Sequence, residues 1–221
     1  MIEYMKSKIQ YFSKVELILW LGSAAMILLS FCLFDRVHYI TLAASLIGVT
    51  SLILNAKGNP LGQFFMILFC LFYGAISFSF AYYGEMLTYL GMSMPMAIFS
   101  LISWKRHPYN GNASEVKVSP ISLGNQIFMW LSSVLVTAIF YFILKYFNTA
   151  NIIPSTVSVT TSFIAAYLTF KRNPYYAIGY AANDIVLIIL WILATLENRM
   201  YASVVICFIA FLANDIYGFI N

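Results

Sequence analysis

The sequence contains very few charged residues. Only 9% of its 221 residues are Asp, Glu, Lys or Arg, 62% are hydrophobic, and the mean hydropathy is +0.85. Soluble domains carry about 25% charged and about 45–50% apolar residues. A folded chain of this length leaves much of its surface outside, and this one has too few polar side chains to cover that surface. The composition therefore excludes a water-soluble globular protein and indicates a chain solvated by lipid.

Cysteine and histidine are scarce as well. The three cysteines, Cys32, Cys70 and Cys207, all lie in apolar runs, where a free thiol packs as a small hydrophobic side chain. The two histidines, His38 and His107, lie in connecting segments. No group of Cys and His residues has the spacing of a metal site. We therefore expect no metal and no other cofactor.

Long apolar runs are abundant. A transmembrane helix needs about 20 mainly apolar residues. Eight segments meet this requirement: 16–34, 37–56, 61–83, 85–104, 125–147, 152–170, 174–195 and 200–220. The strands of a transmembrane barrel would alternate polar and apolar residues, and these segments do not. The sequence predicts an all-α integral membrane protein with about eight transmembrane helices.

Lysine and arginine are unequally divided between the two sides that eight spans define. Nine lie on one side: Lys6, Lys8, Lys14, Lys57, Lys105, Arg106, Lys117, Lys171 and Arg172. Three lie on the other: Arg36, Lys145 and Arg199. Because basic residues accumulate in cytoplasmic loops, we expect both termini in the cytoplasm.

A four-residue pattern, Lys-x-Asn-Pro, occurs at 57–60 and again at 171–174, an offset of 114 residues. Each copy ends one apolar run and opens the next, and proline suits the first turn of a helix. The offset predicts two parallel three-helix repeats, which an odd linker helix must join. The expected parts are an N-terminal segment with an extra helix, the first repeat, a cytoplasmic loop with the linker helix, and the second repeat: 1–35, 36–104, 105–151 and 152–221. Parallel repeats are a known transporter design.

The span at 174–195 carries polar side chains near its centre. Tyr176, Tyr180 and Asn183 recur at helical spacing, with Asp184 beside Asn183. A lipid-facing carboxylate at mid-membrane costs about 2.5–3.5 kcal/mol, so such groups normally face the bundle interior or a water-filled path. Aromatic rings stack on a flat heterocycle, and a few placed polar groups orient it. The stripe favours a site for a nucleoside-sized solute; hydrogen bonding between helices is the alternative.

Other residues have two interpretations or a structural one. Gln63, one turn after Pro60, either lines the same path or caps its helix, and Asn214 either contacts substrate or pairs structurally with a neighbouring helix. Trp104 lies near the end of a span and is expected in the interfacial aromatic belt. Pro95 is expected to kink its helix.

From about residue 35 onward, the chain resembles the PnuC family of bacterial nicotinamide riboside transporters. The resemblance rests on "NPLGQFFMILFCLFYGAISFSFAYYGE", on "TVSVTTSFIAAYLTFKRNPYY" and on the Asn of the seventh span. The family is similar in architecture to SWEET sugar transporters, with three, one and three helices. The resemblance implies facilitated diffusion of the unphosphorylated nucleoside through the bacterial cell membrane, and trapping by a cytoplasmic riboside kinase.

The chain departs from the family in one motif. The family pattern in this span is Trp-x-x-Trp-x-x-x-Asn. Anchored on Asn183, it places the first Trp at Tyr176 and the second at Gly179. The second aromatic ring is therefore lost unless Tyr180 replaces it. Because relatives handle thiamine, riboflavin or deoxynucleosides, the changed rings leave the exact substrate open.

Several functions are consistent with these features. The leading one is a riboside uniporter that rocks one repeat against the other, with substrate bound by Gln63, Tyr176, Tyr180, Asn183, Asp184 and Asn214. The second is a proton-coupled carrier of a nucleoside or B vitamin, with Asp184 titrating as substrate binds. A membrane-embedded enzyme is disfavoured, because only Asp184 and Asp215 are available at membrane depth and no histidine is near either. A scaffold gives no reason for a desolvated carboxylate. The sequence leaves open whether the chain forms a homo-oligomer.

Overall fold

The computed structural model describes residues 11–79 and 83–220, and these residues are mainly helical. Within them, eight segments are long and apolar enough to cross a membrane: Lys14–Asp35, Tyr39–Ala56, Pro60–Phe78, Tyr83–Arg106, Leu123–Tyr146, Ile152–Phe170, Tyr176–Glu197 and Arg199–Ile220. They coincide with the eight predicted spans, so the all-α, multi-pass prediction is confirmed. Lys6 and Lys8, which entered the charge count, lie outside the described residues.

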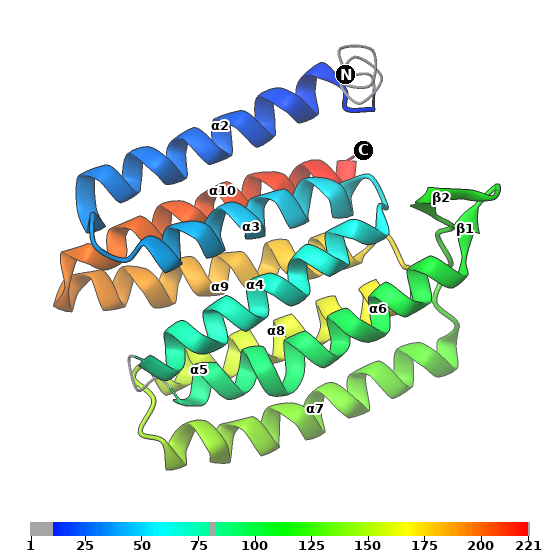
Figure 1. The fold of residues 1–221 in the computed structure, drawn as a ribbon. Coiled ribbons are helices and arrows are strands. Elements are labelled where there is room, and N and C mark those ends of the chain that lie inside the picture. Colours follow the sequence, from blue (N-terminus) through cyan, green and yellow to red (C-terminus); the bar gives the residue numbers. More distant parts are fainter. Residues whose placement is uncertain (1–10, 80–82, 221) are drawn as a thin grey trace.

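The helices follow one another with short connections (Figure 1). The first half contains α2 (Lys14–Ser30), extended by a π-helical turn at Phe31–Asp35, then α3 (Tyr39–Ala56), α4 (Pro60–Ser79), α5 (Tyr83–Leu87) and α6 (Met94–Arg106). The second half contains α7 (Leu123–Tyr146), α8 (Ile152–Phe170), α9 (Tyr176–Glu197), a 3₁₀ turn at Arg199–Tyr201 and α10 (Ala202–Ile220).

A small antiparallel hairpin, β1 (Pro108–Tyr109) and β2 (Asn112–Val116), connects the two halves. The sequence analysis treated this segment only as a loop. Its turn residues, Asn110 and Gly111, both have positive φ, at 48° and 78°. An Asn-Gly pair adopts these angles readily, and the resulting turn matches the twist of the flanking strands.

The fourth span is interrupted where the sequence contains Pro95. A π-helical turn at Thr88–Ser93 separates α5 from α6, and Pro95 lies in the first turn of α6. Proline lacks an N–H and its ring clashes with the carbonyl four residues earlier, so a wider turn before it removes the conflict. Such turns are frequent at functional sites. The structure thus shows a π-helical turn next to Pro95, and the kink expected there stays a prediction.

The two Lys-x-Asn-Pro loops have the same conformation. Gly58 and Arg172 occupy equivalent positions and have φ of +64° and +58°. In each loop, the Asn donates its backbone N–H to the carbonyl five residues earlier at 2.9 Å. The side-chain oxygen of each Asn accepts the N–H two residues later. Shared backbone geometry supports the interpretation of the motif as a repeat.

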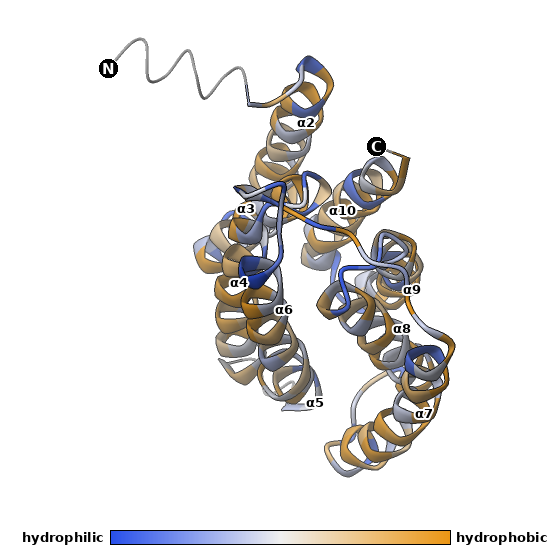
Figure 2. Cartoon of the chain, turned by 90° about the vertical axis from the view of Figure 1, so that its right-hand side faces the viewer, coloured by the Kyte–Doolittle hydropathy of each residue, from blue (hydrophilic) through white to orange (hydrophobic). Residues whose placement is uncertain are grey.

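The packing of the helices has the same internal symmetry. In one half α3 packs on α4 and α4 on α6; in the other α8 packs on α9 and α9 on α10. The halves meet where α3 packs on α10 and where α6 packs on α8. These two contacts are equivalent, because α3 corresponds to α8 and α6 corresponds to α10 in the repeat. Figure 2 shows α4 and α6 on one side and α7, α8 and α9 on the other. One helix precedes each repeat in the chain: α2 comes before α3, and α7 comes before α8. We propose 36–104 and 152–221 as the two repeats.

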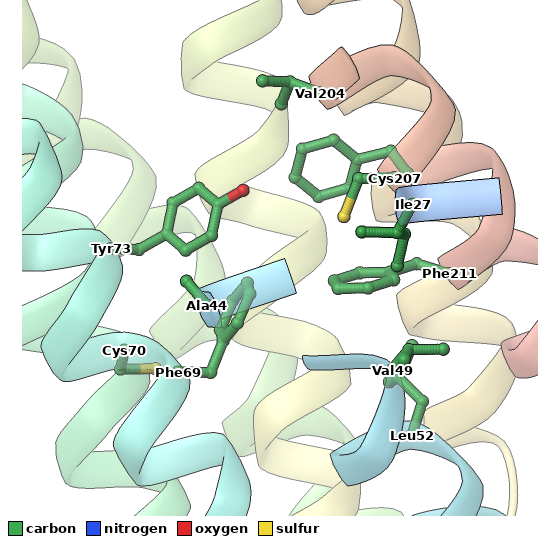
Figure 3. Packing of buried hydrophobic residues seen from close by; sticks show 11 residues of the cluster. Ile27, Ala44, Val49, Leu52, Phe69, Cys70, Tyr73, Val204, Cys207 and Phe211 are labelled. Atoms are coloured by element: carbon green, nitrogen blue, oxygen red, sulfur yellow. The ribbon is translucent and has the colours of Figure 1, made fainter. Parts of the chain in front are cut away.

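The largest described apolar cluster joins four helices. Val49 and Leu52 of α3, Phe69 of α4 and Phe211 of α10 pack together in it, with Ile27 of α2 at its side (Figure 3). Large apolar side chains also cover the outer faces of the helices, which is the arrangement expected where lipid is the solvent.

Candidate substrate-binding site

A cavity of about 950 Å³, including its open mouth, lies between the two halves. Five segments contribute its polar and aromatic side chains: α4 with Phe69, the α5–α6 segment with Glu85, Thr88, Tyr89 and Ser93, α8 with Ser155, Ser158 and Ser162, α9 with Tyr180, Asn183 and Asp184, and α10 with Phe208, Phe211 and Asp215. Mainly apolar walls with a few polar groups are typical of small-molecule sites. We call this space the central cavity.

Asn183 is held in one orientation by α8. Its side chain is buried, and its Oδ1 accepts hydrogen bonds from the Thr161 hydroxyl at 2.9 Å and from the Ser162 hydroxyl at 3.0 Å. An amide has one accepting oxygen and two donating hydrogens on nitrogen. Asn183 lines the central cavity, and because its oxygen is occupied by α8, its NH₂ group is the part of the amide that can serve a ligand as a hydrogen-bond donor.

Asp184 of α9 and Asp215 of α10 are electrostatic neighbours. Both residues line the central cavity, and their exposed fractions are only 4% and 5%. One oxygen of Asp184, Oδ2, is buried and has no hydrogen-bond partner. The helix crossing of α9 and α10 thus brings two carboxyl groups together on one wall.

Aromatic rings also line the central cavity. The ring centroid of Phe69 lies 5.8 Å from that of Phe211 and 6.0 Å from that of Tyr89. Tyr180 adds a ring from the same helix as Asn183. Gly179, where the family pattern places its second Trp, packs instead against α8, and a Cβ there would stand 2.9 Å from the Ala165 Cα. Tyr180 therefore supplies the ring on the cavity wall.

Tyr176 lies outside the wall of the central cavity, toward the face that carries the two Lys-x-Asn-Pro loops, which we call the lysine face. Its hydroxyl donates to the Asn55 carbonyl at 2.7 Å, and its ring centroid lies 6.1 Å from that of Trp104. The prediction that Trp104 lies in an interfacial belt is wrong. Trp104 is only 1% exposed, so it lies inside the helix bundle, and its indole N–H donates to the Thr169 carbonyl at 2.8 Å.

Gln63 and Asn214 also lie outside the cavity wall. Gln63 is 1% exposed and donates to the Asn55 Oδ1 at 2.8 Å. Asn214 donates to the Ser23 hydroxyl at 2.9 Å and to the Ala210 carbonyl at 2.7 Å, so it joins α10 to α2. Of the six predicted site residues, the structure brings Tyr180, Asn183 and Asp184 to the cavity and places Gln63, Tyr176 and Asn214 in neighbouring polar contacts.

Glu85 connects the central cavity to the face opposite the lysine face. It lines the central cavity and two further cavities, of about 850 Å³ and 620 Å³, whose walls include Glu197, Asn198 and Tyr201 from the α9–α10 connection. Toward the lysine face, Asn55, Gln63 and Tyr176 form a hydrogen-bonded layer. The central cavity thus has two further cavities on one side and a hydrogen-bonded polar layer on the other.

Sequence reasoning missed several residues of the cavity wall. Asp215 was left between structural pairing and substrate contact and was omitted from the predicted site, although "ANDI" at 182–185 recurs at 213–216 and so marked two similar sites. Glu85 lay at the edge of an apolar run. Phe69, Tyr89 and Phe211 have no local signal that separates them from the many other aromatic residues of the chain.

Comparisons with known proteins identify the family and the fold of the chain. A family model described as "Nicotinamide mononucleotide transporter" matches residues 38–221. The nicotinamide riboside transporter PnuC of Neisseria mucosa is 24% identical over 216 residues, which cover 96% of this chain and 80% of that protein. A crystal structure of the vitamin B3 transporter PnuC superposes with a TM-score of 0.81 at 21% identity and covers 95% of this chain and 90% of that one. Because the family model covers most of the sequence, this chain belongs to the nicotinamide mononucleotide transporter family, the PnuC family of membrane transporters.

Proposed function

We propose that the protein carries nicotinamide riboside, or a closely related nucleoside, down its concentration gradient across the bacterial cell membrane. The central cavity supports this proposal more than any other observation. It offers rings for a flat base, an amide donor on Asn183 for its polar groups, and carboxyl groups for a positive charge. The name of the curated relative points to the same solute.

The charges of the cavity favour the riboside over its phosphorylated form. Glu85, Asp184 and Asp215 line the cavity, and no Lys, Arg or His is among its lining residues in the described part of the chain. A phosphate monoester adds about −1.5 to −2 charges at pH 7 and needs cationic or backbone N–H partners. The riboside lacks this charge, and its pyridinium ring is a cation.

Alternating access follows from the two halves. We propose that the lysine face is cytoplasmic, as the distribution of basic residues suggests. The layer of Asn55, Gln63 and Tyr176 then closes the cavity toward the cytoplasm, and the cavities around Glu85 admit substrate from outside. A cytoplasmic kinase would trap the riboside as its phosphate, which the cavity does not accept.

Counterflow in liposomes tests the proposal. Purified protein is reconstituted in vesicles loaded with unlabelled nicotinamide riboside, and uptake of the labelled riboside is measured without any ion gradient. We expect transient accumulation of label with the riboside and none with the mononucleotide. A parallel series with thiamine, riboflavin and deoxynucleosides identifies the preferred solute. The proposal is wrong if none of the ribosides exchanges, or if exchange requires an imposed sodium gradient.

A further inference from the structure

Glu85 lies where three cavities meet. Among the described lining residues, it alone is common to the central cavity and to both cavities on the face opposite the lysine face. We call the latter two the outer cavities. Residues of the α2–α3, α7–α8 and α9–α10 connections take part in their walls. Glu85 therefore marks the junction between the outer cavities and the central cavity.

Two aromatic rings line the outer cavities beside this junction. Trp191 of α9 and Tyr201 line both outer cavities, and in the described part of the chain Glu85 is the one other residue that does so. The centroids of the two rings lie 5.3 Å apart and their planes differ by 54°, so the rings meet at an angle. The faces of aromatic rings attract cations, and the face of tryptophan attracts them most strongly.

The charged side chains of the outer cavities are mainly acidic. Glu85 and Glu197 take part in the lining, as does Asp35, whose carboxylate is hydrogen-bonded to His38 at 2.6 Å. The described lining residues include no Lys or Arg. A cleft lined by charges of one sign raises the local concentration of ligands of the opposite sign. These walls therefore favour a cation and disfavour a phosphate.

Tyr73 of α4 connects the aromatic residues of the two regions. It lines the outer cavity of about 620 Å³. Its ring centroid lies 4.6 Å from that of Phe69 and 5.3 Å from that of Tyr89, and both of these residues line the central cavity. Aromatic rings thus continue from the outer cavity to the central cavity.

The hydroxyl of Tyr73 has no partner within the described residues. The side chain is only 4% exposed, and its hydroxyl oxygen is buried without a hydrogen bond. The neighbouring Ser45 hydroxyl donates instead to the Thr41 carbonyl at 2.9 Å. Figure 3 shows the Tyr73 hydroxyl pointing away from Cys70 and Phe69. A buried polar atom without a partner normally marks a missing ligand or water.

We propose that Glu85, Trp191, Tyr201 and Tyr73 form an outer subsite, which binds the positively charged ring of the solute before the solute enters the central cavity. This inference rests on the proposed function. The ligand class is a flat N-substituted pyridinium with a carboxamide. Trp191 and Tyr201 bind its ring, Glu85 balances its charge, and the Tyr73 hydroxyl donates a hydrogen bond to the carboxamide oxygen. Binding at the outer subsite moves no other ion, so the solute still moves down its own concentration gradient.

Tryptophan fluorescence tests the outer subsite, because no Trp lines the central cavity in the described part of the chain. The probe is the 1-methylnicotinamide cation, which has the charged ring of the riboside but no ribose. Pyridinium cations quench tryptophan on contact, so we expect saturable quenching in the whole protein in detergent. Trp191→Phe should remove the saturable part, whereas Trp130→Phe, the same change on the exposed surface of α7, should retain it.

The same titration tests the charge of Glu85. Glu85→Gln should raise the dissociation constant for quenching by ~two- to fivefold, because the cation loses an opposite charge. Glu115→Gln makes the same chemical change in β2, which bonds to Gly58 on the lysine face, and should leave the constant unchanged. The outer subsite is refuted if quenching by the cation does not saturate, or if the saturable part persists in full in Trp191→Phe.

Uptake into liposomes tests what the outer subsite contributes to entry. Nicotinamide riboside is compared at low external concentration with the uncharged C-riboside of benzamide, which has nearly the same shape. Trp191→Leu should slow the uptake of the cation by ~2- to 30-fold and that of the neutral riboside less, whereas Trp130→Leu should slow neither. Equal slowing of both ribosides in Trp191→Leu would show that the substitution only damages the protein, and would refute the outer subsite. Saturable quenching in a wild-type protein that exchanges neither riboside would instead refute the proposed function.

Discussion

Gly48 of α3 lines the central cavity and is a position where one added methyl group should impair the site. A Cβ at this residue would stand 2.9 Å from two ring atoms of Phe69 and closer still to the Phe211 Cζ. Carbon atoms in contact are about 3.5–4.0 Å apart, so both rings must shift. Gly48→Ala thus acts on two cavity rings without changing any polar group.

Both rings have close aromatic neighbours. Phe69 is packed against Tyr73 with centroids 4.6 Å apart, and Phe211 against Phe208 at 5.6 Å. Both rings also line the central cavity, so we expect the added methyl group to displace them into it. Overpacking of this kind costs about 1–3 kcal/mol. If a bound ligand must push the rings back, its affinity falls by ~5–150-fold.

Gly22→Ala is the matched control. Gly22 lies in α2, and a Cβ there would meet no atom within 4 Å. Both variants gain the same helix propensity, about 1 kcal/mol, so their difference reports the clash alone. Calorimetric titration with nicotinamide riboside and a thermal melt of each variant are the assays. Equal affinity in Gly48→Ala and Gly22→Ala would show that the rings do not form the wall of the binding site.

Three further predictions concern residues around the cavity. Gln63→Leu should lower the free energy of unfolding by about 1–3 kcal/mol, because a buried amide oxygen on α3 loses its hydrogen-bond donor. Thermal melts should show this loss of stability, while the affinity for the ligand stays unchanged. A loss of affinity without a loss of stability would show instead that Gln63 contacts the ligand. Thr161→Val should weaken riboside binding ~two- to tenfold by removing one of the two hydroxyls that orient Asn183, and an unchanged dissociation constant in calorimetry would contradict that role. Arg172→Gly should stabilise the protein by about 1 kcal/mol, because φ is +58° at Arg172 and glycine adopts this region without strain. Gly58→Ala makes the opposite change at the equivalent position of the other loop and should destabilise the protein. Melting temperatures that shift in the same direction in both variants would refute the argument.

The helices and the repeat were accessible from the sequence because they depend on local patterns. Each apolar run of sufficient length must form a helix in lipid, since only helices and closed barrels satisfy the backbone there. The loops at Gly58 and Arg172 share one geometry because Asn and Pro impose it through contacts a few residues apart. The hairpin at Asn110 and Gly111 carried an equally local signal, which the sequence analysis did not use.

The site was only partly accessible from the sequence. Asn183 and Asp184 stood out because polar groups at membrane depth are rare, and both line the cavity. Gln63 and Asn214 stood out for the same reason, yet they bond to Asn55 and Ser23 outside the wall. A polar residue in an apolar run indicates that its side chain needs a hydrogen-bond partner. Which residue becomes that partner depends on how another helix packs against it.

The sequence by itself determined the solvent, the number of spans and the pairing of the two repeats, because composition, run length and short turns act within one segment. Only the tertiary structure decided that Asp184 lies near Asp215, that Tyr180 rather than Gly179 supplies the ring, and that Glu85 lines the central cavity. These contacts join residues from different helices. Their geometry depends on how closely and at what angle the helices cross. Small residues such as Gly48 and Gly179 allow a close approach, because a Cβ at either position would collide with residues of other helices that are distant in sequence.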